Sequence, residues 1–176
     1  MGWSFKLHGG LAAGLGTVLL AFAGLTWLPG TLPLTGVGWL LVAIVVLLFP
    51  VFIAALVRLL LARADPRSMW LAFRCLPGKV QLALGALFLS GVTLLVLSGV
   101  GEGNLQAAER KGDRYFAFDT TPYERGTIEV SRSQYMAVVE RDQRHIFAIP
   151  GVLFVCAAYG VLTAGELRRA ELGPST

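Results

Sequence analysis

The sequence predicts an all-α membrane protein: a bundle of four transmembrane helices, with a small β-hairpin and helix inserted between the third and the fourth. The chain of 176 residues is 55% hydrophobic and only 15% charged, whereas soluble domains carry about 25% charged residues. A soluble chain of this length would lack the interior volume to bury so much apolar surface. Charged residues are absent from residues 9–57, 80–101 and 146–165, and one membrane-spanning helix needs about 20 such residues.

The first uncharged stretch is long enough for two helices. Two prolines and two glycines interrupt it at residues 28–36, and both residue types end helices and favour turns. We therefore expect spans of about 9–28 and 37–60. Trp27 and Trp39 flank this turn, as befits residues that favour the headgroup level. Pro50 lies inside the second span and is expected to kink it.

The N-terminus also has features of a secretory signal peptide. Lys6 precedes an apolar run that contains the small-residue motif Ala21-Phe22-Ala23, which is typical of a cleavage site. The apolar run continues to Leu28, which is longer than a usual signal, so retention as the first span is the favoured interpretation. Cleavage after residue 23 remains the alternative and would leave three spans.

The remaining spans are expected at about 80–100 and 146–165. The segment between the second and third spans alternates Met69, Trp70 and Phe73 with basic residues. This pattern fits either a short helix in the headgroup plane or a helix end followed by a loop. Since basic segments stay in the cytoplasm, we expect a plasma-membrane protein with both termini cytoplasmic. The topology determinants are Arg58, Arg63, Arg67, Arg74 and Lys79.

Residues 101–145 are expected to form an extracytoplasmic loop. Between Glu102 and His145 the chain holds eight acidic residues and seven basic ones, a balance that suits a solvated surface. Residues 105–110 are expected to form a short helical turn, and residues 115–118 and 127–130 have the composition of strands. Ser131 and Gln134 have the spacing of a capping box, and the helix that they begin is expected to run directly into the fourth span.

This loop is too small to form an independent core. The two cysteines, Cys75 and Cys156, fall in different spans or their ends, so we expect them to lie too far apart for a disulfide. The loop must therefore be ordered by packing on the fourth helix, on the bilayer or on a partner. Its aromatic residues are candidate partner contacts, with anchoring at the membrane interface as the alternative. The candidate contact residues are Tyr115, Phe116, Phe118, Tyr123 and Tyr135.

The sequence contains no motif for catalysis, for a cofactor or for a metal. The histidines His8 and His145 are isolated. A membrane enzyme that acts on lipid would need two of Glu124, Glu129 and His145 within hydrogen-bond reach. The expected spans hold no Asp, Glu, Lys or Arg at mid-depth, which argues against a proton-coupled carrier.

Pairs of small residues spaced by four occur in three of the expected spans, and such pairs let helices approach closely. We expect them to pack inside the bundle; self-association is the alternative. The net charge of +4 is interpreted as a topology signal and not as a nucleic-acid interface. The pairs are Gly10 and Gly14, Ala86 and Ser90, and Gly160 and Ala164.

These observations favour a non-enzymatic accessory protein that contacts another membrane or extracytoplasmic protein through its external loop and last helix. The expected partners are the lipid bilayer and that second protein, with no cofactor. The alternative is a small transporter or channel subunit that acts as an oligomer. The sequence leaves the oligomeric state and the identity of the partner open.

Overall fold

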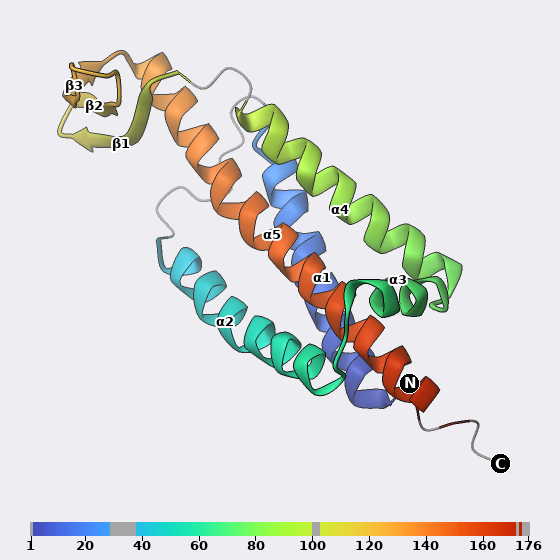
Figure 1. Ribbon diagram of the computed structural model, residues 1–176. Helices are drawn as coiled ribbons and strands as arrows, with labels where there is room; N and C mark the ends of the chain where they lie inside the picture. Colours follow the sequence, from blue (N-terminus) through green and yellow to red (C-terminus); the bar gives the residue numbers. More distant parts are fainter. Residues whose placement is uncertain (1, 29–37, 100–102, 172, 174–176) are drawn as a thin grey trace.

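A computed structural model describes residues 2–28, 38–99, 103–171 and 173. The molecule is mostly helical, with a three-stranded antiparallel sheet between its fourth and fifth helices (Figure 1). Four of the described helices are long and apolar enough to cross a membrane. The helices are α1 (Trp3–Leu25), α2 (Gly38–Leu61), α3 (Pro66–Arg74), α4 (Gly78–Gly99) and α5 (Arg132–Glu171). The strands are β1 (Leu105–Lys111), β2 (Arg114–Asp119) and β3 (Gly126–Val130).

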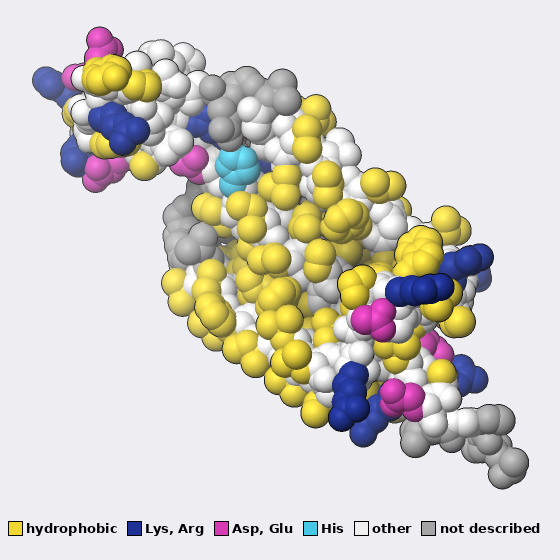
Figure 2. Space-filling model, in the orientation of Figure 1, with side chains coloured by type: hydrophobic (Ala, Val, Ile, Leu, Met, Phe, Trp, Pro, Cys, Tyr) yellow, Lys and Arg dark blue, Asp and Glu magenta, His cyan; other side chains and the backbone are white. Residues whose placement is uncertain are grey.

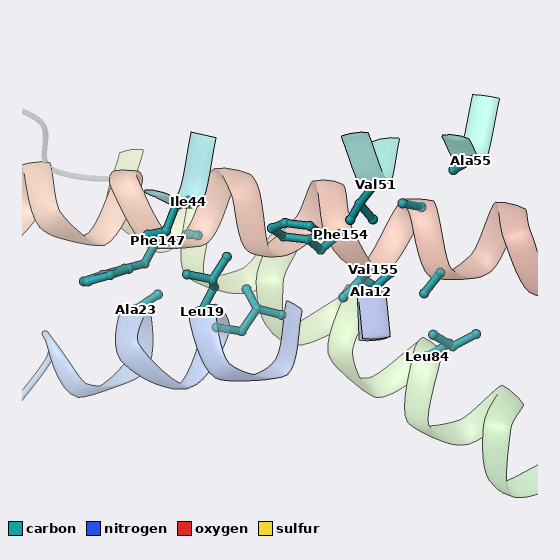
Figure 3. Close-up of a cluster of buried hydrophobic side chains, with 14 of the residues drawn as sticks. Ala12, Leu19, Ala23, Ile44, Val51, Ala55, Leu84, Phe147, Phe154 and Val155 are labelled. Atoms are coloured by element: carbon teal, nitrogen blue, oxygen red, sulfur yellow. The ribbon is translucent and has the colours of Figure 1, made fainter. Parts of the chain in front are cut away.

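Helix α5 is the centre of the bundle. In its most apolar stretch 61% of the residues are buried, compared with 17% in α2 and 11% in α4. Figure 3 shows Phe147 and Phe154 of α5 among side chains of α1 and α2, and both phenylalanines are fully buried. The outward faces of α2 and α4 carry exposed valine, leucine and phenylalanine side chains, as expected where lipid replaces water around the protein.

Glycines set the distance between α1 and α5. A Cβ atom added at Gly16 would lie 2.9 Å from Cγ2 of Val155 and 3.0 Å from the carbonyl oxygen of Gly151. Because that carbonyl belongs to a helix backbone, it has no freedom to move aside. The small residues therefore allow the two helices to approach closely, as small residues do in membrane bundles.

The small-residue pairs predicted from the sequence divide into two groups. Gly160 contacts α2, since an added Cβ atom would meet Leu59 Cδ1 at 2.9 Å, and Ala164 is fully buried. This pair packs inside the bundle, as predicted. The other two pairs do not: Gly10, Gly14, Ala86 and Ser90 are exposed.

The helices predicted as spans are present with shifted ends. Helix α1 begins six residues earlier than predicted, at Trp3 instead of residue 9, and ends at Leu25. Most of the predicted turn at residues 28–36 lies outside the described residues. Pro50 and Pro150 lie inside α2 and α5 without ending either helix, which membrane helices tolerate because neighbouring groups satisfy the freed carbonyls.

The last span is part of a much longer helix, as predicted. Helix α5 has 40 residues, so it is about 60 Å long, twice the roughly 30 Å of a bilayer core. Its capping box is formed, because the backbone N–H of Gln134 donates to Ser131 Oγ at 3.2 Å and that of Ser131 donates to Gln134 Oε1 at 2.9 Å. The polar first third of α5 therefore extends beyond the apolar bundle (Figure 1).

The prediction of a helical turn at residues 105–110 is wrong, because these residues form strand β1. The predicted hairpin is therefore two strands of a three-stranded sheet, in the order β1-β2-β3. Helix-favouring residues dominate the segment, but pairing with β2 overrides that weak local preference. Gly112, with φ of 61°, supplies the positive φ that a two-residue hairpin turn requires.

The segment after α2 forms a separate short helix, α3, and is not merely the end of α2 followed by a loop. Asp65 caps α3 by accepting hydrogen bonds from the backbone N–H groups of Arg67 (2.9 Å) and Ser68 (3.0 Å). Pro66 occupies the first turn, where its missing N–H costs nothing. Trp70 stacks on Phe73 with their ring centroids 5.8 Å apart, so aromatic and basic side chains share this short helix.

Candidate functional site

The sheet has two faces that differ in chemistry. In the register of β2 and β3, Tyr115 lies opposite Val130 and Ala117 lies opposite Ile128. This face turns toward α5, and Ala117 and Val130 are buried. The opposite face, called here the sheet face, consists of Gln106, Glu109, Lys111, Arg114, Phe116, Phe118, Thr127 and Glu129.

The sheet is fastened to α5 by an aromatic pair and an arginine. The rings of Tyr115 and Tyr135 contact each other, with centroids 4.9 Å apart. Arg141 donates hydrogen bonds to the carbonyl oxygens of Gly103 and Leu105, at the start of β1. Hydrogen bonds from a charged donor contribute more than neutral ones, so Arg141 fixes where the sheet leaves the bundle.

An irregularity in β1 lies where this strand meets α5. The pairing of β1 with β2 shifts between Gln106 and Glu109, and Ala107 has φ of 49°. A β-bulge of this kind redirects backbone groups out of the strand ladder. The backbone of Ala107 lies near the carboxylate of Asp142 on α5, whose pKa burial raises above its usual value. The bulge therefore adjoins the part of α5 that carries Arg141.

A second arginine connects the same part of α5 to the end of α1. Arg144 Nε donates to Thr26 Oγ1 at 3.1 Å, and Arg144 Nη2 donates to the carbonyl oxygen of Thr26 at 3.4 Å. Its guanidinium lies over the Trp27 ring, 4.1 Å from the centroid. A cation at the C-terminal end of a helix donates hydrogen bonds to the unpaired carbonyl oxygens and interacts favourably with the negative end of the helix dipole.

Hydrogen bonds also close the end of the sheet opposite the β1–β2 turn. The backbone N–H and hydroxyl of Thr120 both donate to the carbonyl oxygen of Asn104 at 2.8 Å. Asp119 accepts from the hydroxyl and the backbone N–H of Thr121. Both bonds lower the pKa of Asp119 below its usual value of 3.8, and the bond from the hydroxyl has the larger effect. Asp119 is therefore ionised at neutral pH and accepts both bonds.

The sheet face combines two aromatic rings with paired charges. Phe118 is 39% exposed, and Phe116 lies beside Lys111, whose Nζ is 5.8 Å from the ring centroid. Lys111 also pairs with Glu109 at 3.0 Å. Arg114 pairs with Glu129 at 3.7 Å. Aromatic residues are enriched in protein interfaces, whose rim is polar and accessible to solvent.

The structure divides the five predicted contact residues. Tyr115 and Tyr135 contact each other between the sheet and α5, so they hold the sheet in place. Phe116 and Phe118 lie on the opposite side of the sheet. Tyr123 is fully exposed in the turn before β3 and has φ of 72°. Phe118 and Tyr123 are therefore the exposed members of the set, whereas Tyr115, Phe116 and Tyr135 are half-buried.

The predicted topology determinants lie at the other end of the molecule. Arg58 is in the last turn of α2, Arg67 and Arg74 are in α3, and Lys79 is in the first turn of α4. Figure 2 shows basic side chains gathered at this end, beside the chain termini, and a broad hydrophobic surface between it and the sheet.

The three residues considered for an enzyme that acts on lipid belong to different parts of the structure. Glu129 pairs with Arg114 on the sheet face, and Glu124 is exposed in the turn before β3. His145 belongs to α5. In the part of the chain that the structure describes, no three His, Cys, Asp or Glu residues are grouped as metal ligands would be.

The sequence interpretation did not identify Arg141 and Arg144 as the residues that attach the sheet and α1 to α5. One signal was available: the two charges closely precede an uncharged span and lie about one helical turn apart. Most of the hydrogen-bond acceptors of these arginines are backbone carbonyls, which carry no residue identity, so the sequence does not show these pairings.

Comparison of this chain with protein-family models, with curated proteins and with solved structures found no match.

Proposed function

We propose that this chain is a non-enzymatic membrane protein that binds another protein through its sheet face and the turn that carries Tyr123. The observation that carries the proposal is the division of the aromatic residues. One pair, Tyr115 and Tyr135, holds the sheet on α5, while Phe118 and Tyr123 are exposed on the other side and at the tip.

This attachment favours recognition of a partner, because it orders the sheet before the partner binds. Three short strands have little stability alone, yet Arg141 and the Tyr115–Tyr135 contact fix them on a helix that extends beyond the bundle. A partner that meets an already rigid surface loses less conformational entropy on binding. Exposed tyrosine and phenylalanine side chains are effective interface anchors, since they bury large areas with few rotatable bonds.

A photoreactive phenylalanine analogue tests this proposal directly. Placed at Phe118 or at Tyr123 in intact cells, the analogue is expected to form adducts with one distinct protein after irradiation. The same analogue at Tyr115, on the same strand as Phe118 but on the face toward α5, is the matched control. It should yield no intermolecular adduct, because its ring contacts Tyr135.

Equal adducts from positions 115 and 118 would contradict the proposal, because they would show labelling without regard to the face of the sheet. An adduct with a second copy of the chain would also contradict it and would favour the oligomeric transporter or channel subunit. Capture of only lipid at positions 118 and 123 would assign these rings to anchoring at the membrane interface.

We also propose that the chain lies in the plasma membrane with its sheet extracytoplasmic and both termini in the cytoplasm. The support is the gathering of basic side chains at the end opposite the sheet (Figure 2), since basic segments are retained on the cytoplasmic side. The charges around the sheet are close to balanced, with two exposed ion pairs across the sheet face. A segment of this kind exerts little topological control.

The two cysteines allow a simple test of sidedness. Cys75 is exposed at the end of α3, so after Cys156→Ser it is the single thiol. A membrane-impermeant maleimide is expected to modify it only after the cells are lysed. In a second variant, Tyr123→Cys with both native cysteines changed to serine, the thiol is expected to react in intact cells. The reverse pattern of labelling would contradict this topology and would indicate the opposite orientation.

A further inference from the structure

A groove lies at the end of the molecule opposite the sheet, between the start of α1, the second half of α2 and the end of α5. It has a volume of about 520 Å³, and we call it the inner groove. Its lining has two chemically distinct parts. Ser4, Arg58 and Arg168 form the polar part, and side chains of α2 that include Ile53, Val57 and Leu61 form most of the apolar part.

Arg58 is held in place and still has a donor to offer. Its Nη2 atom donates to Ser4 Oγ at 2.7 Å, and its guanidinium lies over the Phe5 ring, 4.5 Å from the centroid. Its Nη1 atom is buried and has no hydrogen-bond partner among the described residues. A buried donor without a partner is unfavourable, and an anionic oxygen is the acceptor that satisfies a guanidinium best.

Arg168 brings a second positive charge to the inner groove from a distant part of the chain. It is exposed in the last turns of α5. The neighbouring Arg169 pairs with Glu166 at 3.7 Å and lines a different hollow, with residues of α3. Within the described part of the chain, neither Arg58 nor Arg168 has a carboxylate at ion-pair distance. Among the described residues, the two positive charges of the polar part therefore have no acidic side chain to balance them.

The apolar part extends from these charges toward the middle of α2. Ile53, Val57 and Leu61 are 53%, 46% and 76% exposed, and they follow each other at intervals of one helical turn. From Ile53 to Leu61 the backbone rises about 12 Å. A ligand that fits the groove must combine an anionic end with a long apolar one.

We propose that the inner groove binds an anionic phospholipid, with its headgroup phosphate on Arg58 and Arg168 and an acyl chain along Ile53, Val57 and Leu61. A soluble phosphate would use the arginines and leave the apolar part unoccupied. An apolar protein helix would cover Ile53 and Leu61 and leave the two charges unpaired. The lipid satisfies both parts, and it comes from the bilayer that already surrounds α2. This inference is independent of the proposed function of the sheet.

Quenching of Trp3 by brominated lipid measures this binding. Trp3 is 75% exposed and precedes Ser4, which lines the groove. The full chain with Trp27→Phe, Trp39→Phe and Trp70→Phe is reconstituted in vesicles of brominated phosphatidylcholine. Unbrominated phosphatidylglycerol then displaces the quencher, and the recovery of Trp3 fluorescence gives the preference for the anionic lipid. Each arginine near a membrane surface contributes roughly a fivefold gain in binding of anionic lipid.

Arg168→Gln is therefore expected to lower this preference about fivefold, and Arg58→Gln is expected to lower it at least as much. Arg169→Gln is the matched control, adjacent in sequence and equal in charge change, and less than about a twofold effect is expected because Glu166 already pairs with it. Since Arg168 is exposed, its variant should fold even if Arg58→Gln does not. The proposal is overturned if wild-type chain shows no preference for phosphatidylglycerol, or if Arg168→Gln and Arg169→Gln have equal effects.

Discussion

Replacement of Gly16 by leucine is expected to lower the free energy of unfolding of the bundle by about 1–3 kcal/mol or more. The side chain would have to enter space in which Val155 Cγ2 lies 2.9 Å and the carbonyl oxygen of Gly151 lies 3.0 Å from an added Cβ atom. The methyl group of Val155 has some freedom to rotate away, but the backbone oxygen has none. Helix α1 must therefore move away from α5, which loosens the core around Phe154.

Gly14→Leu is the matched control for this prediction. An added Cβ atom at Gly14 meets nothing within 4 Å, and both substitutions gain the same helix propensity of up to about 1 kcal/mol. Unfolding in mixed micelles with increasing denaturing detergent is expected to show an earlier midpoint for Gly16→Leu and an unchanged or later one for Gly14→Leu. Similar midpoints for the two variants would mean that α1 and α5 do not cross at Gly16.

Arg141→Ala is expected to release the sheet from α5 while the bundle stays folded. The substitution removes charged donors to the carbonyl oxygens of Gly103 and Leu105, and hydrogen bonds to charged groups contribute about 1.5–3 kcal/mol each. Amide hydrogen exchange in residues 105–119 should accelerate about tenfold or more, since 1.4 kcal/mol corresponds to one factor of ten. Exchange in α1 and in the apolar part of α5 should not change.

The control for this prediction is Arg132→Ala, on the exposed first turn of the same helix. It removes an equal charge from α5 without touching the start of β1, so exchange in the sheet should stay as in the unaltered chain. If both variants accelerate exchange equally, the sheet is held by the general charge of α5 and not by the bonds of Arg141. Loss of the photoadducts at positions 118 and 123 in Arg141→Ala would connect this attachment to partner binding.

Most of the helical architecture is predictable because lipid leaves the backbone few alternatives. A chain in hydrocarbon must satisfy each N–H and C=O group internally, so uncharged stretches of sufficient length become helices whatever their neighbours are. Helix α1 begins earlier than predicted, because Ser4 and Lys6 are polar enough to be left out of a predicted span and still continue the helix. The capping box at Ser131 and Gln134 was recognisable for a similar local reason, since both of its partners lie within one turn.

Strand β1 was not predictable from its own residues. Leu105, Gln106, Ala107 and Ala108 favour a helix, and only pairing with β2 makes them a strand, which is a contact that local preference does not encode. The division of the aromatic residues between the two faces of the sheet was likewise decided by a tertiary contact. The strand period places Tyr115 and Phe116 on opposite faces, but which face meets Tyr135 depends on how α5 passes the sheet.

The amino-acid sequence by itself determined that four segments are helices fit to span a bilayer, and that basic residues outnumber acidic ones outside the segment 102–145. The reason is local: solvation by lipid and the helical period act on each segment separately. Only the tertiary structure decided that α5 is the central helix, that Gly16 packs while Gly14 is open, and that Arg58 and Arg168 share one groove. Helices in lipid have no hydrophobic drive to choose a neighbour, so shape complementarity and a few polar contacts choose it.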